Sequence, residues 1–320
     1  MINLKKYVKI LGIPLLFALI IHFIFDGDFS EFLKIMSLSF IFFVPFGIGL
    51  LTVYFSSIKN INTPGYRFTA PWVSVLLFLL ITLCFSIEGW ACWLMVLPVF
   101  FIASSIGGYV GAKLKIKTKK GKTYLSALVM LPFLISPIEN YTGAHPSIYK
   151  AYTFIDIDAE KDDIWSNVTR VKTIAPKQDN GWLTSSLGFP RPIRAELNYN
   201  GVGGYRKAIF DKGLIFHEAV TDYTEGRSMS FTITANPHEI PSTAMDEHVV
   251  IGGKYFDVMD GTYELDQLNR KKYRLHLYSH FKLSTTFNFY ASIWANWIMK
   301  DIQNNILQVI KQRAEQQSKS

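Results

Sequence analysis

Hydrophobic and polar residues are distributed differently in the two halves of this 320-residue chain. In the first half, four long apolar runs occupy about residues 7–25, 34–56, 71–87 and 90–112. Each run is close to the ~20 residues that a helix needs to cross ~30 Å of hydrocarbon. The pattern therefore predicts four transmembrane helices. The first run ends without a small-residue cleavage motif, which indicates an uncleaved anchor.

A fifth apolar run, at residues 124–138, is short for a membrane span. The lysines before it and the acidic Glu139 after it favour a crossing. The alternative is a re-entrant or surface helix, because an apolar run of this length does not require a span. We predict about five spans, with residues 1–138 as a multi-span transmembrane domain, 139–150 as a linker and 151–317 as a soluble domain.

Charged residues between the apolar runs predict the orientation of the chain. Lysine and arginine gather before the first run, between the second and third, and in the loop KLKIKTKKGK, whereas the intervening loops carry Asp and Glu. Since cytoplasmic loops collect positive charge, the N-terminus and the lysine-rich loop are predicted inside. A fifth span would place the soluble domain outside the cytoplasm, and its absence would leave that domain inside. The lysine cluster most simply fixes topology, and recruitment of anionic lipid is the alternative.

The second half of the chain has the period of strands. Residues 153–158 alternate, short helical patterns follow at 162–168 and 182–189, and a long helix is predicted from about 288 to 315. Between them, turn residues separate six further predicted strands. These are IRAELNY, GYRKAIF, LIFHEAVTDY, SMSFTITA, KYFDVMDGTYEL and KKYRLHLYSHFKLS.

Alternation along these strands predicts which side chains share the covered face of the sheet. The predicted inward sets are Leu214, Phe216, Glu218 and Val220; Met229, Phe231 and Ile233; and Tyr273, Leu275, Leu277, Ser279 and Phe281. The opposite face carries polar side chains, as expected of an antiparallel sheet with one covered side. On the long helix, an apolar stripe that includes Trp294 and Trp297 must pack onto a large apolar surface.

Composition excludes some classes of function. The net charge of +8 lies in the apolar half, since residues 151–320 hold 20 basic and 20 acidic side chains. A nucleic-acid interface needs cations gathered on one surface, so we predict no nucleic-acid partner. The two cysteines, Cys84 and Cys92, lie in or beside apolar runs, so the soluble half has neither a disulfide nor a thiolate metal site.

Glu218 is the polar residue of most interest, because parity places it on the same covered face as Phe216 and Val220. A buried carboxyl must be paired, hydrogen-bonded or raised in pKa, which makes it a candidate ligand anchor or general acid/base. The alternative is a structural ion pair with a neighbouring strand or the terminal helix.

Other motifs carry weaker signals. The stretch DEHVVIGGKYFD contains Asp246, Glu247, His248 and Tyr255, which could form an acid/base group at the cavity mouth or cap and register the sheet edge. His276 and His280 share a strand face but lie ~13 Å apart, too far for one ion, and no metal-binding spacing occurs, so we predict no metal. NGVGG lies between two strands and is read as a hairpin turn, not a phosphate cradle.

The order of elements, and particular stretches within it, carry a family resemblance. FIDIDAEKDDIW, GVGGYRKAIFDKGLIFHEAVTDYTEGRSMSFTI and GGKYFDVMDGTYEL resemble the SRPBCC superfamily, the START-like helix-grip domains. With the membrane helices, the chain is similar to bacterial membrane-tethered members often labelled polyketide cyclase or dehydrase. The resemblance implies a curved antiparallel sheet around a long C-terminal helix, with an apolar cavity between them, and it carries over no fixed catalytic set.

The primary hypothesis from the sequence is a bacterial inner-membrane protein whose extracytoplasmic helix-grip domain binds a hydrophobic small molecule or lipid, without a cofactor. A cyclase-like or hydrolase-like enzyme is the second hypothesis, and a sensing or assembly module that binds nothing is the third. Protein partners are not predicted. The candidate ligand-binding residues are Glu218, Tyr255, His248, Phe216, Phe231, Trp294 and Trp297.

Overall fold

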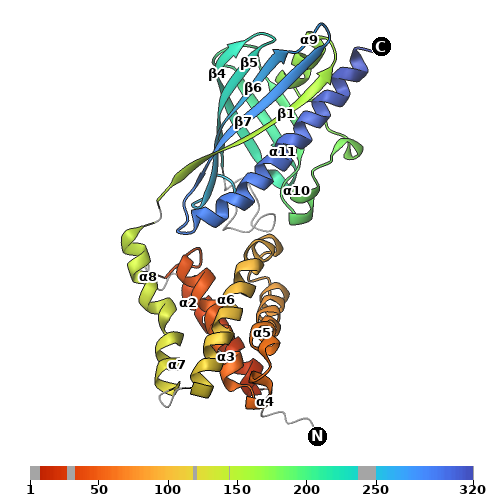
Figure 1. Cartoon of the computed structure of the whole chain (residues 1–320). Coiled ribbons are helices and arrows are strands. Elements are labelled where there is room, and N and C mark those ends of the chain that lie inside the picture. The colour runs from red at the N-terminus through yellow and green to blue at the C-terminus, as the bar shows by residue number, and fades with distance from the viewer. Residues whose placement is uncertain (1–7, 27–32, 118–120, 144, 237–249, 320) are drawn as a thin grey trace. The chain divides into compact units, whose positions relative to one another are not determined.

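The computed structural model of the chain describes residues 8–26, 33–117, 121–143, 145–236 and 250–319. It contains two compact units (Figure 1). The helical unit comprises Met1–His145 with Thr285–Phe287, and the sheet unit comprises Pro146–Ser284 with Asn288–Ser320.

Three helices of the helical unit are long and apolar enough to cross a membrane. They are Val8–Asp26, formed by η1 (Val8–Gly12) and α2 (Ile13–Asp26), α5 (Pro64–Cys84) and α6 (Trp90–Lys117). The second predicted span is a shorter apolar helix, Ser39–Phe55, formed by η2 (Ser39–Phe43) and α3 (Val44–Phe55). A short helix, α4 (Ile58–Ile61), precedes α5. Within the described residues, three helices therefore meet the length and composition of a membrane span, where the sequence predicted about five.

The run predicted as a fifth span forms two helices, α7 (Gly121–Val129) and α8 (Leu131–Thr142). They are separated at Met130, two residues before Pro132, which lies in the first turn of α8. Proline is tolerated at the start of a helix but cannot continue the hydrogen-bond ladder of a preceding one. The break therefore follows from the sequence LPF.

Glycines allow α3 and α6 to approach closely. A Cβ on Gly49 would lie 1.8 Å from the Ser104 carbonyl oxygen, and one on Gly107 would lie 1.9 Å from that of Phe46. Only hydrogen fits at these positions. Small residues at such contacts are typical of helices that associate in lipid, where backbone proximity and dispersion stabilise the pair.

The sheet unit contains one antiparallel sheet of seven strands in the order β1-β7-β6-β5-β4-β3-β2. The seven predicted strands all form. The strands are β1 (Ser147–Asp158), β2 (Pro192–Leu197), β3 (Tyr205–Phe210), β4 (Ile215–Thr224), β5 (Ser228–Ala235), β6 (Phe256–Gln267) and β7 (Lys272–Leu283). Strand β1 begins earlier than the alternation at 153 suggested, because its residues from Ser147 onward pair with β7 down to Leu283.

The remaining elements cover one side of this sheet. Between β1 and β2 lie α9 (Lys161–Thr169), η3 (Pro176–Gln178) and α10 (Trp182–Leu187). The short turn η4 (Asp211–Gly213) joins β3 to β4, and α11 (Asn288–Gln317) ends the chain. Figure 1 shows α11 lying along the curled sheet, and its Leu307 and Ile310 are buried in the core with Leu275 and Trp165.

The predicted strand faces are confirmed by burial. Phe216, Glu218 and Val220 are buried, and so are Met229 and Phe231. On β7, residues alternate between buried and partly exposed along the whole strand. A curled sheet with a covered inner face and a long terminal helix is the arrangement that the helix-grip prediction required.

Candidate functional site

A cavity of ≈ 70 Å³ lies on the inner face of the sheet, beneath α11. Strands β2 to β7 and the segment before β2 supply its walls, and α11 closes it with Met299, Ile302, Gln303 and Ile306. Most of the lining is apolar. Arg194, which is exposed, also lines the cavity, so the cavity reaches the surface beside β2.

The polar part of the lining begins with an ion pair between neighbouring strands. Arg206 on β3 lies directly opposite Glu218 on β4 in the register of the sheet. The Arg206 Nη1 donates to Glu218 Oε2, and the side chains are only 4% and 3% exposed. A buried charge is stable only when paired and hydrogen-bonded, so the two side chains depend on each other.

Two aromatic rings complete the surroundings of Arg206. The guanidinium carbon lies 5.5 Å from the centre of the Phe231 ring, a cation–π distance. The hydroxyl of Tyr263, which is buried on β6, interacts electrostatically with the Arg206 guanidinium. The Arg206 Nε donates to the carbonyl oxygen of Thr169 at 3.4 Å, at the end of α9. Arg206 therefore joins three strands and a helix end.

Under the combined effects of burial and pairing, the pKa of all three groups, Glu218, Tyr263 and Arg206, is raised. Burial raises the pKa of the Glu218 carboxyl, and the Arg206 guanidinium partly offsets this effect. Burial also raises the pKa of the Tyr263 hydroxyl, again against the influence of Arg206. Although burial disfavours its charge, Arg206 has a raised pKa because Glu218 and Tyr263 stabilise the guanidinium. The cluster thus holds a cation whose charge is balanced within the cavity wall.

A second polar corner is built around Gln303 of α11. Its Oε1 accepts a hydrogen bond from Thr153 Oγ1 at 3.1 Å, and its Nε2 donates to Ser279 Oγ at 3.0 Å. All three side chains are buried. Gln303 and Ser279 also line the cavity. The helix is therefore fixed to β1 and β7 by an amide that also faces the cavity.

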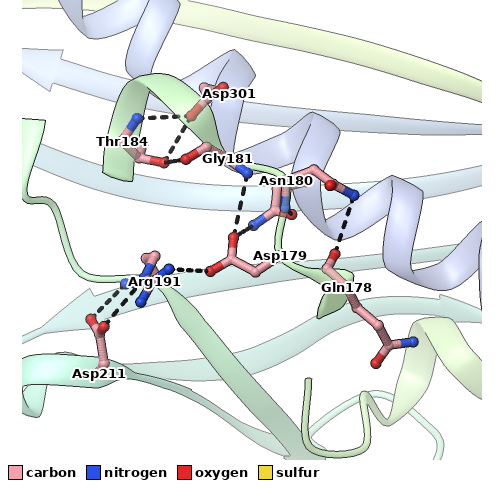
Figure 2. Close-up of polar contacts among 9 residues, drawn as sticks. Gln178, Asp179, Asn180, Gly181, Thr184, Arg191, Asp211 and Asp301 are labelled. Atoms are coloured by element: carbon pink, nitrogen blue, oxygen red, sulfur yellow. Dashed lines mark hydrogen bonds and ion pairs between the residues drawn. The ribbon is translucent and has the colours of Figure 1, made fainter. Parts of the chain in front are cut away.

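The segment 170–191, which we call the strap, crosses from α9 to β2 and contributes Val171 and Ile174 to the cavity wall. Figure 2 shows the polar contacts at its centre. Asp179 accepts from Asn305 Nδ2 at 2.8 Å and pairs with Arg191 at 3.0 Å. Asp301 of α11 accepts from the backbone and hydroxyl of Thr184, at 2.9 and 2.8 Å (Figure 2).

The contact of Asp301 with Thr184 caps α10 from another helix. The first amides of a helix have no partner within it, and a carboxylate satisfies them. Further along the strap, Arg313 donates to the carbonyl oxygens of Lys172 and Thr173, each at 2.8 Å. The strap is therefore held along the polar side of α11, and two of its apolar residues line the cavity.

The residues predicted from the sequence fall into two groups. Glu218, Phe216 and Phe231 line the cavity. Tyr255, Trp294 and Trp297 do not: Tyr255 precedes β6 and is half-buried, Trp294 is half-buried, and Trp297 is 54% exposed. His248, with Asp246 and Glu247, lies outside the described residues. Glu218 was predicted as a ligand anchor, a general acid/base or a member of a structural ion pair. Its carboxylate forms an ion pair with Arg206, and it also lines the cavity.

Histidines of the described strands lie on the other face of the sheet. His276 Nδ1 lies 2.9 Å from the hydroxyl of Tyr152, and His280 Nδ1 lies 2.8 Å from Asp260 Oδ1. Within the described ranges, no group of three His, Cys, Asp or Glu side chains is placed to hold a metal ion.

Sequence reasoning missed Arg206, Tyr263 and Gln303. For Arg206 a signal was present, because it and Glu218 are equally distant from Lys212 in the turn DKG, and a tight hairpin turn sets the register. Tyr263 shares its face with Leu265 and Gly261, so alternation along β6 could also have predicted that it points inward. Gln303 gave no signal, because a polar residue on a helix is ordinarily solvated.

Comparison with known proteins gives structural neighbours alone. No protein-family model and no curated protein matches the chain. The Zhui aromatase/cyclase from Streptomyces sp. R1128 is 13% identical over 53% of this chain and 96% of its own, with a TM-score of 0.35. A START superfamily protein from Mycobacterium smegmatis is 9% identical over 52% and 98%, with a TM-score of 0.36. Norcoclaurine synthase from Thalictrum flavum is 11% identical over 52% and 86%, with a TM-score of 0.32.

These likenesses are of low identity and concern the fold alone, so the chemistry of the site is taken from this chain's own residues. The structural neighbours include an aromatase/cyclase and a START superfamily protein, which are the kinds of protein that the sequence resembles.

Proposed function

We propose that the chain is a membrane-anchored binding protein for a hydrophobic small molecule or lipid, which enters the cavity beneath α11. The observation that carries this proposal is the lining of the cavity. It is mostly apolar, with a few buried polar groups from Arg206, Glu218, Tyr263 and Gln303 at fixed positions. Apolar walls with a small number of convergent polar groups are typical of ligand sites, in which burial supplies affinity and polar contacts supply orientation.

The charge of the polar groups favours an uncharged polar end on the ligand. Arg206 is already balanced by Glu218, so a ligand carboxylate or ammonium would compete with an existing buried pair. A hydroxyl or carbonyl would instead exchange hydrogen bonds with Tyr263 or Gln303. An apolar cavity of ~150 Å³ takes up benzene in another protein. The ≈ 70 Å³ of this cavity therefore suits the end of a chain or the edge of a ring, with the rest toward Arg194.

We further propose that the helical unit anchors the chain in a bacterial inner membrane through about five spans. The three long apolar helices support anchoring. Ser39–Phe55 and the pair α7 and α8 would supply the other crossings, and the lysine-rich loop before α7 would then lie in the cytoplasm. In this topology the soluble domain, predicted at 151–317, is extracytoplasmic. Reporters fused after Lys150 that function on one side of the membrane only would test this orientation.

The binding proposal is tested by filling the cavity in the full chain. Ala208 lines the cavity from β3, whereas Lys207 precedes it on the opposite face of the same strand. At least one apolar compound is expected to co-purify with the wild-type protein. We expect Ala208→Phe to lower the amount of that compound by fivefold or more. Organic extraction of the purified chain followed by mass spectrometry measures this loss.

Lys207→Phe is the matched control, because it adds the same ring on the outer face. Lipids held by the helical unit are common to all three proteins and cancel in the comparison. Identical extracts from the wild type, Ala208→Phe and Lys207→Phe would contradict the proposed function. A cyclase-like or hydrolase-like activity on a hydrophobic substrate stays a prediction of the sequence.

A further inference from the structure

The first turns of α11 expose a continuous apolar surface. Phe289, Ile293 and Trp297 follow one another at a spacing of four residues and are 70%, 46% and 54% exposed. Tyr290 and Trp294 lie beside them, half-buried. The Trp294 indole donates to the Tyr290 hydroxyl at 3.1 Å, and the Trp294 and Trp297 rings meet edge to face at 5.4 Å. We call these five residues the outer stripe.

The outer stripe is not the face that packs on the sheet. Ala295, Ile298 and Met299 form the buried side of the same turns. The segment is therefore apolar on both sides, and it carries no charged residue from Ser284 to Met299. Exposed apolar area costs roughly 25 cal/mol per Å² in water, so contiguous exposed aromatic side chains mark an interaction surface.

We propose that the outer stripe is a membrane-binding surface that lies in the interfacial layer of a lipid bilayer. Tryptophan and tyrosine are enriched at this depth, because their rings are amphipathic and suit a region that is apolar on one side and wet on the other. The mixture in the stripe, two Trp, one Tyr, one Phe and one Ile, matches that requirement. Because the stripe carries no charge, its binding would come from burial of apolar side chains and would not require anionic lipid. A bilayer of zwitterionic lipid is therefore sufficient for binding.

A bilayer is a better occupant than another protein for two reasons. The described residues include three helices long and apolar enough to cross a membrane, and the anchoring proposed above would keep lipid close to the chain. In addition, Thr285–Phe287, directly before α11, belongs to the helical unit, so the stripe begins where the chain leaves that unit. The inference rests on the membrane anchoring in the proposed function but does not depend on ligand binding in the cavity.

Two positions on α11 provide an internal measurement of depth. Ile293 is in the outer stripe, whereas Gln308 is exposed 15 residues further along the same helix, ~22 Å away at 1.5 Å per residue. Spin labels would be placed at Ile293→Cys or Gln308→Cys in the full chain, with Cys84→Ala and Cys92→Ala to remove the native thiols. The protein would be held in phosphatidylcholine nanodiscs, and relaxation by oxygen and by a water-soluble nickel chelate would be compared.

We expect the label at 293 to collide more often with oxygen than with the nickel chelate, and the label at 308 to show the reverse. Phe289→Cys provides a second label in the stripe, should the first disturb folding. Equal access of the chelate at 293 and 308 would overturn the proposal. Protection of 293 from both reagents would also overturn it, because it would show a protein contact, either with the helical unit or with a second copy.

The outcome is separable from the test of the cavity. The labelled side chains do not line the cavity, so the extracted compounds serve as a readout of ligand binding in the same variants. Loss of lipid contact with retained compounds would reject the outer stripe alone. Retained lipid contact with no bound compound would reject the cavity alone.

Discussion

The two ends of helix α11 differ in which side chains are covered: apolar side chains are exposed at its start, and polar side chains are buried further along. From Asn288 to Met299 the helix is uncharged and aromatic, yet Phe289 and Trp297 are among the exposed apolar residues of the chain. From Lys300 onward it is rich in polar residues, yet Gln303 and Asn305 are 2% and 3% exposed. Polarity alone therefore does not indicate which part of this helix is covered.

The difference lies in the partners that each part finds. Asn305 contacts Asp179 and the Asn180 backbone, and Gln303 contacts Thr153 and Ser279. A buried polar group is stable when such bonds are made and costly when they are not. The polar end of α11 thus sets the position of the helix on the sheet. The aromatic end carries the outer stripe, which we propose binds a lipid bilayer.

The largest effect is expected inside the sheet unit, where polar groups are buried most deeply. Glu218→Gln removes the charge that balances Arg206 and leaves a guanidinium buried without a counterion. Breaking such a pair from one side costs ~3–5 kcal/mol. Because each 1.4 kcal/mol is about tenfold, we expect hydrogen exchange at the slowest amides of β4 and β5 to accelerate by more than a hundredfold.

A double variant distinguishes loss of pairing from loss of packing. Arg206→Met with Glu218→Leu replaces both charges by apolar groups of similar size, which is often neutral for stability. We expect most of the protection lost in Glu218→Gln to return. If the double variant exchanged as fast as the single one, the ion pair would not be the cause. The same result affects assays of function, since Glu218→Gln alone changes stability as well as any ligand contact.

A smaller effect is expected at the polar end of α11. Asp301→Ala removes the carboxylate that accepts from the Thr184 backbone and hydroxyl, shown in Figure 2. Loss of a helix N-cap costs ~0.5–2 kcal/mol. We expect faster hydrogen exchange in the strap around α10, with β4 and β5 unchanged. Asn304→Ala, at an exposed neighbouring position, should leave the strap unchanged, and equal exchange in the two variants would contradict the role of Asp301.

The sheet was predictable from the sequence because alternation and turns are local signals. The parity of residues 214–220 placed Glu218 inside, and each predicted strand overlaps an observed one. The register that brings Arg206 opposite Glu218 also follows from a tight turn at DKG, since the two residues are equally distant from Lys212. The apolar pattern of α11 predicted that Trp294 and Trp297 need an apolar neighbour, but periodicity does not say whether that neighbour is the cavity, the sheet or lipid.

The smallest effect on stability is expected at the aromatic end of α11. Trp297→Gln replaces a side chain that is 54% exposed and lies outside the cavity lining. Surface substitutions of this kind usually change stability by less than ~0.5 kcal/mol. Hydrogen exchange in the sheet unit of detergent-solubilised protein should therefore match the wild type. In phosphatidylcholine nanodiscs, however, the spin label at 293 should gain access to the nickel chelate, because the stripe has lost the more exposed of its two indole rings. A large loss of protection in detergent would instead show that Trp297 packs within the fold, and the contrast between the two ends of α11 would disappear.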